Sequence, residues 1–292
     1  MKSENMLNKH PYKSVKKLIK PAMDVWRVGD PRCVICGEYA PKTKEHAPPK
    51  AIFPKKPSDL ITVPACEKCQ KSEDEGFRDF IAYNCVRKPT KSSIELLEKI
   101  NSTLIYRSPR KEYMEQFFNK AEKRLEFEQD KVTNEIQPKI KVIWSKELFD
   151  PIILKIAHAY HWLLNEGSVL VDEKGKLLLI HDYDPSSDLG GQITGQSYPS
   201  VNIGDGQFIL TLIRGFEEAP FDTTFCMGLH FHTDDDVRKG YSVQVFFLLD
   251  KYEGVNPLSS SIIQSLIDGS SDSSIYDLSI PLYKRYPEYL RL

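Results

Sequence analysis

Apolar positions in the second half of the chain predict one amphipathic helix followed by several strands. Asp150 and Pro151 form a typical N-cap and first helical position, and Gly167 a C-terminal stop. Between them a buried stripe recurs at helical spacing: Ile153, Ile156, Ala157, Tyr160, Leu163 and Leu164. Strand-like apolar runs follow at residues 169–171, 177–180, 208–213, 223–232 and 241–249. Residues 140–292 are therefore predicted to form an α+β domain with a mostly antiparallel sheet.

Residues 1–130 follow a different pattern. The first 30 residues are basic and polar, with one short helix predicted near residues 15–19. Seven prolines fall between Pro31 and Pro64, which favours hairpins and loops there. Apolar residues at helical spacing then predict three helical stretches: one beginning just after Cys69, one over residues 94–104 and one over residues 112–130. The chain thus divides into a basic arm at 1–30, a module with a helical extension at 31–130 and the α+β domain at 140–292.

Charge is distributed unevenly along the chain. Residues 1–57 hold 13 Lys and Arg against 5 Asp and Glu, a balance of +8, so the remaining residues carry −9 of the net charge of −1. A basic front favours an anionic partner, although solvated charged tails that bind nothing are also common. The longest apolar run, residues 245–249, is far shorter than the roughly 20 residues of a membrane span. The lysine-rich start does not resemble a secretory signal either, so we expect a cytoplasmic protein without a membrane partner.

Four of the six cysteines form two Cys-x-x-Cys pairs, Cys33/Cys36 and Cys66/Cys69. Two such pairs can place four thiolates tetrahedrally around Zn²⁺. The 29 residues between the pairs exceed the roughly 15–20 of a zinc ribbon, so a larger insert lies between them. Four protein ligands leave no open position on the metal, and we therefore expect this zinc to be structural.

The insert between the cysteine pairs carries residues suited to phosphodiester chemistry. Glu45 directly precedes His46. A histidine can act as general base on water near neutral pH, and a carboxylate is a hard oxygen ligand for Mg²⁺ or Mn²⁺. Taken alone, such a pair is more often a salt-bridged surface feature. Five lysines around the pair could hold a phosphate backbone: Lys42, Lys44, Lys50, Lys55 and Lys56.

The order and spacing of these motifs resemble the HNH (ββα-metal) endonuclease family. The matching stretches within residues 31–84 are Cys33-Val-Ile-Cys36, Glu45-His46-Ala-Pro-Pro49, Asp59-Leu-Ile-Thr-Val-Pro and Cys66-Glu-Lys-Cys69-Gln70. The resemblance implies a treble-clef-like zinc scaffold whose β-hairpin and helix bind one divalent metal and cleave DNA, with RNA an open alternative. Proteins that join such a module to an unassigned domain resemble components of restriction or antiphage defence.

The resemblance also implies a role for each matching residue. His46 would activate water, and Glu45 would ligate the catalytic Mg²⁺ or Mn²⁺. Asp59 stands where the family has an asparagine that orients the histidine, and an ionised carboxylate lacks the amide donor. Gln70 stands at the third motif position and offers a neutral amide oxygen to the metal. Three nearby acids either supply an anionic ligand or simply favour a helix N-terminus: Glu73, Asp74 and Glu75.

A metal-dependent endonuclease is therefore the expected function, with two alternatives left open. One is a zinc module that binds nucleic acid without cutting it. The other is a protein-interaction module in which the zinc is purely structural. Residues 140–292 carry no motif that assigns them a role, and homo-oligomers or a partner protein fit the sequence equally well.

Other chemistry-bearing residues are expected to be structural. His158, His161, His230 and His232 could form a second metal site, but buried histidines with ordinary hydrogen bonds are the simpler interpretation. Residues 234–236 are expected to be a solvated turn, and Cys85 and Cys226 small core residues or surface thiols. The chain has no P-loop, Gly-x-Gly-x-x-Gly or Gly-x-Ser-x-Gly motif, which argues against nucleotide hydrolysis, Rossmann cofactors and α/β-hydrolase chemistry.

Overall fold

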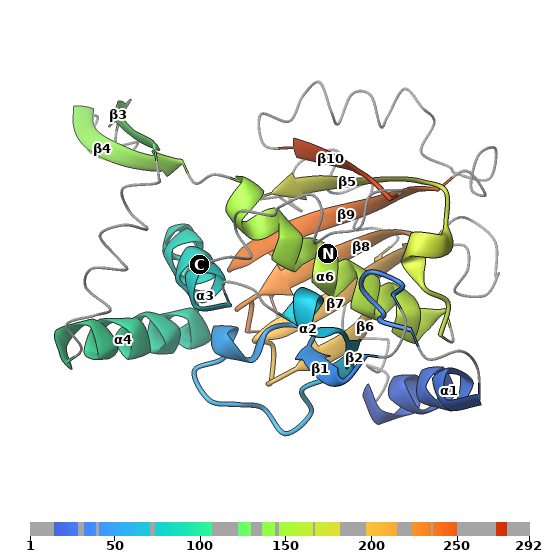
Figure 1. Ribbon diagram of the computed structural model, residues 1–292. Helices are drawn as coiled ribbons and strands as arrows, with labels where there is room; N and C mark the ends of the chain where they lie inside the picture. The colour runs from blue at the N-terminus through green and yellow to red at the C-terminus, as the bar shows by residue number, and fades with distance from the viewer. Residues whose placement is uncertain are drawn as a thin grey trace, which may run out of the picture.

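A six-stranded antiparallel sheet is the largest element of the fold (Figure 1). A computed structural model describes residues 15–28, 32–38, 41–70, 74–106, 122–129, 136–143, 146–165, 167–181, 197–214, 224–234, 236–249 and 273–278. Within these residues the strand order is β10-β5-β9-β8-β7-β6. The strands are β5 (Gly175–His181), β6 (Ser197–Ile203), β7 (Phe208–Arg214), β8 (Thr224–Phe231), β9 (Tyr241–Leu249) and β10 (Ser273–Asp277). Together with the helices, the sheet confirms the predicted α+β class.

Helix α6 (Lys146–Leu164) lies across one face of this sheet (Figure 1). The predicted stripe is buried as expected, with Tyr160 as its largest side chain, and Trp162 of the same helix is buried as well. The predicted N-cap at Asp150 is wrong, because the helix begins at Lys146 and contains Pro151. The Asp150 carboxylate instead accepts hydrogen bonds from His181 Nε2 at 2.7 Å and from the Tyr276 hydroxyl. These partners lie on β5 and β10, so long-range hydrogen bonds replace the expected local cap.

Four predicted strands are confirmed as β5, β7, β8 and β9, because each alternates or runs apolar over the length of a buried strand. The strand predicted at residues 169–171 is wrong: a 3₁₀ helix, η4 (Leu170–Asp172), occupies this stretch. Strands β6 and β10 were not predicted, since serine, proline and asparagine interrupt their apolar positions. Their place in the sheet comes from pairing with β7 and β5.

The helix predicted over residues 112–130 is also wrong in its described part. Strand β3 (Glu122–Gln129) pairs antiparallel with β4 (Ile136–Ile143), and Figure 1 shows this hairpin apart from the large sheet. Leu125 and Phe127 alternate with charged residues, which is the period of a strand. Residues 112–121 lie outside the described part of the chain.

Short elements make up the cysteine-containing module. Strands β1 (Thr43–His46) and β2 (Thr62–Ala65) form an antiparallel hairpin in which Glu45 pairs with Val63. Helix α2 (Glu67–Gln70), which contains Cys69, was not predicted, whereas helix α3 (Asp74–Asn84) corresponds to the helix predicted just after Cys69. The remaining elements are α1 (Val15–Val28), η2 (Lys50–Ile52), η3 (Cys85–Arg87) and α4 (Lys91–Tyr106). Helix α1 extends well beyond the predicted residues 15–19, and residues 1–14 of the arm lie outside the described part.

The module and the large sheet share one hydrophobic core, which runs from Ala22 in α1 to Leu278 after β10. Phe80 of α3 stacks on Phe149 of α6 with ring centroids 4.3 Å apart, and it meets Tyr241 of β9 edge-on at 5.2 Å. Phe77 meets Phe231 of β8 edge-on at 5.7 Å. Helix α3 therefore packs against both α6 and the sheet. No helix in the described residues is both long and apolar enough to cross a membrane.

Candidate functional site

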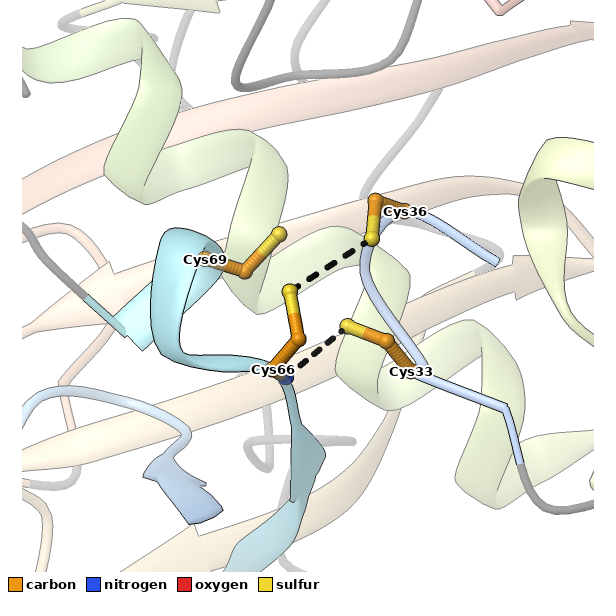
Figure 2. A group of neighbouring side chains, drawn as sticks. All are labelled: Cys33, Cys36, Cys66 and Cys69. Carbon is orange, nitrogen blue, oxygen red and sulfur yellow. Dashed lines mark hydrogen bonds between the residues drawn. The ribbon is translucent and has the colours of Figure 1, made fainter. Parts of the chain in front are cut away.

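The four paired cysteines converge into one cluster (Figure 2). Their sulfur atoms all lie within 4.8 Å of one another. Cys33 and Cys36 come from the turn before β1, while Cys66 and Cys69 come from the end of β2 and from α2. The Sγ atoms of Cys36 and Cys66 are 3.7 Å apart, and the Cys66 backbone N–H donates to Cys33 Sγ at 3.3 Å. Four sulfurs so placed could hold one zinc ion.

The thiols of the cluster share their protons through mutual hydrogen bonds, and a metal ion could replace these protons. The pKa of the Cys33 thiol is lowered because Cys36 and Cys69 direct hydrogen bonds at its sulfur. The pKa values of Cys36 and Cys69 are raised, chiefly because each then holds its proton toward Cys33. A cation at the centre would stabilise all four thiolates at once and release these protons. Among the described residues, this is the only group of three or more His, Cys, Asp or Glu side chains close enough to share an ion.

The turn that carries the first cysteine pair requires a glycine. Gly37 has φ +74°, a left-handed conformation that side chains disfavour. A Cβ atom there would also lie 2.6 Å from Val171 Cγ2 of η4. The Cys33–Cys36 turn is therefore packed directly against the segment that leads into β5.

His46 lies at the end of β1 and is half-buried. Because side chains alternate along a strand, His46 shares a face with the exposed Lys44, while Glu45 points inward. The pKa of His46 is lowered by partial burial first, and then by the charges of Lys56 and Lys50, while Asp74 opposes the shift. The imidazole is therefore held neutral near pH 7, the form that can accept a proton.

All five predicted phosphate-binding lysines are exposed, and two of them act electrostatically on His46. Three come from the β1–β2 loop, and contacts from elsewhere in the fold hold that loop in place. His232 Nε2, just after β8, donates to the Ile52 carbonyl at 2.9 Å, and Lys99 Nζ of α4 donates to the Phe53 and Pro54 carbonyls at 3.2 and 2.9 Å. The lysine-bearing loop is thus fastened to both the sheet and α4.

Glu45 is buried and faces a cation that the sequence did not suggest. Lys155 Nζ of α6 lies 3.4 Å from Glu45 Oε1, and both side chains are at least nine-tenths buried. Burial raises the pKa of Glu45 to about 7, with Lys155 opposing the shift and Asp74 adding to it. Lys155 was not part of the predicted stripe of α6, and its position between the apolar residues Leu154 and Ile156 was the available signal for a special role.

The charge of Asp59, the predicted orienting residue, affects a tyrosine that binds the backbone of the residue after His46. The buried Tyr160 hydroxyl of α6 donates to the Ala47 carbonyl at 3.0 Å. The pKa of Tyr160 is raised by burial and then by the negative charge of Asp59. Asp59 therefore lies close to the anchor that holds the end of β1, and Tyr160 is a second site residue that sequence reasoning placed only in the core.

The oxygen donors proposed for a catalytic metal lie on three elements: Glu45 on β1, Gln70 at the end of α2 and Asp74 at the start of α3. Gln70 Nε2 donates to the Lys44 carbonyl at 3.4 Å, which places this side chain beside β1. Asp74, at the start of α3, is close enough for its charge to raise the pKa values of both Glu45 and His46. Residue 73 and the side chain of residue 75 lie outside the described part. Carboxylate and amide oxygens suit Mg²⁺, but the ammonium of Lys155 already neutralises Glu45.

Two of the other histidines and the two cysteines outside the cluster have structural surroundings. His230 lies between Thr211 Oγ1 at 2.9 Å and Ser242 Oγ at 2.8 Å, as a buried histidine with ordinary hydrogen bonds does. His232 bonds to Ser92 in addition to Ile52. Asp234 accepts a hydrogen bond from the Ser92 backbone at the start of α4, so it is an anchor rather than a free turn residue. Cys85 and Cys226 are buried core residues.

The described site therefore combines a cluster of four thiols, a half-exposed neutral histidine, a surface rich in lysines and a buried carboxylate paired with an ammonium. This arrangement can bind an anionic backbone and can supply one base beside it. No protein-family model, characterised protein or solved structure matches the chain. The function is accordingly inferred from the residues themselves.

Proposed function

We propose that the protein is an HNH-like endonuclease that hydrolyses phosphodiester bonds in DNA, with His46 as the general base. The observation that carries the proposal is the placement of His46. It stands half-exposed at the end of β1 among exposed lysines, in a hairpin-and-helix unit whose two ends meet at the four-cysteine cluster. A histidine beside a phosphate-binding surface is the minimum that water activation requires.

In the proposed reaction the lysine-rich loop binds the phosphate backbone, and one ring nitrogen of neutral His46 removes a proton from the attacking water. Lys50 and Lys56 lie close enough to act on the imidazole, so a phosphate bound between them would lie within reach of that water. Tyr160 and the paired strand β2 hold the end of β1 in position. A divalent metal, held by Glu45 with Asp74 and Gln70, would stabilise the charge that develops on the phosphate.

Plasmid cleavage tests the proposal. Zinc-loaded protein is incubated with supercoiled plasmid and Mg²⁺ or Mn²⁺, beside the His46→Ala variant and an EDTA control. We expect nicking by the wild type, and a loss of about 10²-fold or more in His46→Ala, since a positioned base contributes about 10²–10⁴-fold. Zinc content and thermal melting show that the variant is folded. Nicking that persists unchanged in His46→Ala would contradict the proposal.

The lysines provide a matched test of the substrate surface. Lys50→Gln and Lys56→Gln should each weaken DNA binding and lower the salt dependence by about one counterion. Lys176→Gln, an exposed lysine on β5, should leave DNA affinity unchanged. Equal effects of all three changes would show that DNA contacts the protein without preference for the His46 surface. A parallel titration with RNA of the same sequence distinguishes the two substrates.

One observation favours a second candidate, a zinc module that binds nucleic acid without cutting it. The ammonium of Lys155 satisfies the carboxylate that would hold the metal. Under this candidate the wild type shifts DNA in a gel, no nicking occurs with either metal, and His46→Ala binds as the wild type does. The plasmid and gel measurements together therefore separate the two functions.

A further inference from the structure

The Glu45–Lys155 pair joins the cysteine module to helix α6 through two buried charges. Lys155 Nζ lies 3.4 Å from Glu45 Oε1, and the two side chains are 8% and 7% exposed. The residues are 110 positions apart in the chain, so the pair exists only because α6 packs against β1. Five residues further along the same helix, Tyr160 donates to the Ala47 carbonyl. Helix α6 thus contacts Glu45 and Ala47, the residues on either side of His46.

A buried carboxylate requires a compensating cation, and here the protein supplies it. Removing one partner of such a pair leaves an uncompensated charge in a medium of low polarity. A divalent ion on the same carboxylate would place two further positive charges beside the ammonium, which is unfavourable at this separation. Metal and ammonium are therefore alternative partners of Glu45. The lysine side chain is a flexible four-carbon stem, so it can leave the carboxylate while α6 stays in place.

We propose that Lys155 competes with the divalent metal for Glu45, so that helix α6 sets the metal affinity of the site. This inference rests on the proposed function for its metal, and it identifies how that same site is regulated. In the ion-paired state Glu45 is unavailable as a ligand. Displacement of the ammonium by a high metal concentration makes the carboxylate available. The metal affinity of the site therefore depends on the ion pair that α6 provides.

Metal binding measured directly tests the proposal without reference to activity. The probe is Mn²⁺, whose free concentration is followed by electron paramagnetic resonance in titrations of the zinc-loaded full chain. Lys155→Met keeps the length of the stem and removes the charge. We expect this variant to bind one Mn²⁺ about tenfold more tightly than the wild type, or more, a factor that corresponds to the loss of one close repulsion. Lys176→Met, which changes an exposed lysine on β5, serves as the matched control and should bind as the wild type does.

A second variant locates the metal that is gained. In the double variant Glu45→Gln/Lys155→Met the tighter binding should disappear, because the carboxylate is gone while the buried charge balance is kept. Tight binding that survives in the double variant places the metal elsewhere and overturns the proposal. Equal or weaker Mn²⁺ binding in Lys155→Met overturns it as well. If Lys155→Met does not fold, as judged by zinc content and melting, Lys155→Gln replaces it in the same comparison.

The outcome is independent of whether the protein is a nuclease. Tighter Mn²⁺ binding in Lys155→Met without plasmid nicking by any variant supports the competition and contradicts the proposed function. Nicking that depends on His46, with Mn²⁺ affinity unchanged by Lys155→Met, supports the proposed function and contradicts the competition. The two failures are therefore distinguishable from one set of proteins.

Discussion

At the scale of single residues, the position of His46 depends on groups that lie outside its own strand. The carbonyl of Ala47, the next residue, accepts from the buried Tyr160 hydroxyl, and Ala47 N donates to the Ile61 carbonyl at 3.2 Å. The charge of Asp59 acts on the same hydroxyl. A tyrosine on a helix distant in the chain thus holds the backbone next to His46. The position of His46 is therefore set jointly by the module and α6.

The Tyr160→Phe substitution isolates this hydrogen bond. The ring stays in the core, but the Ala47 carbonyl loses its buried donor, so we expect a loss of about 1–3 kcal/mol in the free energy of unfolding. Urea denaturation followed by circular dichroism measures it. Nuclease activity should fall further than the lost stability explains, because the end of β1 is less well fixed. A variant with unchanged stability and activity would show that the bond has no role.

At the scale of elements, the four-cysteine cluster joins two turns that sequence places far apart. The Cys33–Cys36 turn packs on η4 through Gly37, and the second pair leads through α2 into α3, whose phenylalanines lie in the shared core. The Val34 backbone N–H donates to the Pro64 carbonyl at 3.1 Å, which aligns the first turn with β2. A metal at this junction would therefore stabilise the hairpin and α3 together.

Removal of two ligands tests the metal centre. Elemental analysis should find one zinc ion per chain in the wild type. The double variant Cys66→Ser/Cys69→Ser should lack this zinc, and its melting temperature should fall. The physical reason is that metal binding free energy contributes to folding where the ligands assemble only in the folded state. Cys226→Ala, a buried cysteine outside the cluster, is the matched control and should keep the zinc. Equal zinc content in both variants would contradict a four-cysteine site.

At the scale of the whole molecule, buried histidines connect the stability of the fold to pH. His230 lies within the sheet, and His232 links the end of β8 to the β1–β2 loop through the Ile52 carbonyl. Burial lowers the pKa of each to about 4. Both are therefore neutral in the folded protein at pH 5, whereas the unfolded chain, with a histidine pKa near 6.5, takes up protons.

Stability should consequently be full above pH 6.5 and should fall as the pH drops toward 4. Each histidine adds up to about 1.4 kcal/mol per pH unit to the slope in this range, because the unfolded state binds one more proton per group. Urea midpoints at pH 7, 6 and 5 measure the slope for the wild type and for His232→Gln. The variant is less stable at pH 7 but should show a smaller slope. An identical slope would show that His232 does not titrate in this range.

The sequence by itself determined the features that local spacing controls. The two Cys-x-x-Cys pairs predict the cluster that the structure brings together, since each pair needs only its own tight turn. The stripe of α6, the alternating residue types of β8 and the apolar run of β9 predict a helix and two strands because apolar residues follow the spacing of each element. Glu45, His46 and the lysines lie close together in the chain, so the sequence alone groups them, and their role in catalysis and binding stays a prediction.

Tertiary structure alone decided the partners that these residues acquire. In the sequence, Lys155 is a polar residue between apolar residues of a helix. Only the packing of α6 on β1 places its ammonium beside Glu45. Asp150 fits a local cap, yet hydrogen bonds from β5 and β10 hold it inside the helix. Strands β6 and β10 have weak local patterns and form because neighbouring strands satisfy their backbone groups. Periodicity is set by the few residues around a position, whereas a buried charge depends on whichever distant side chain the fold brings against it.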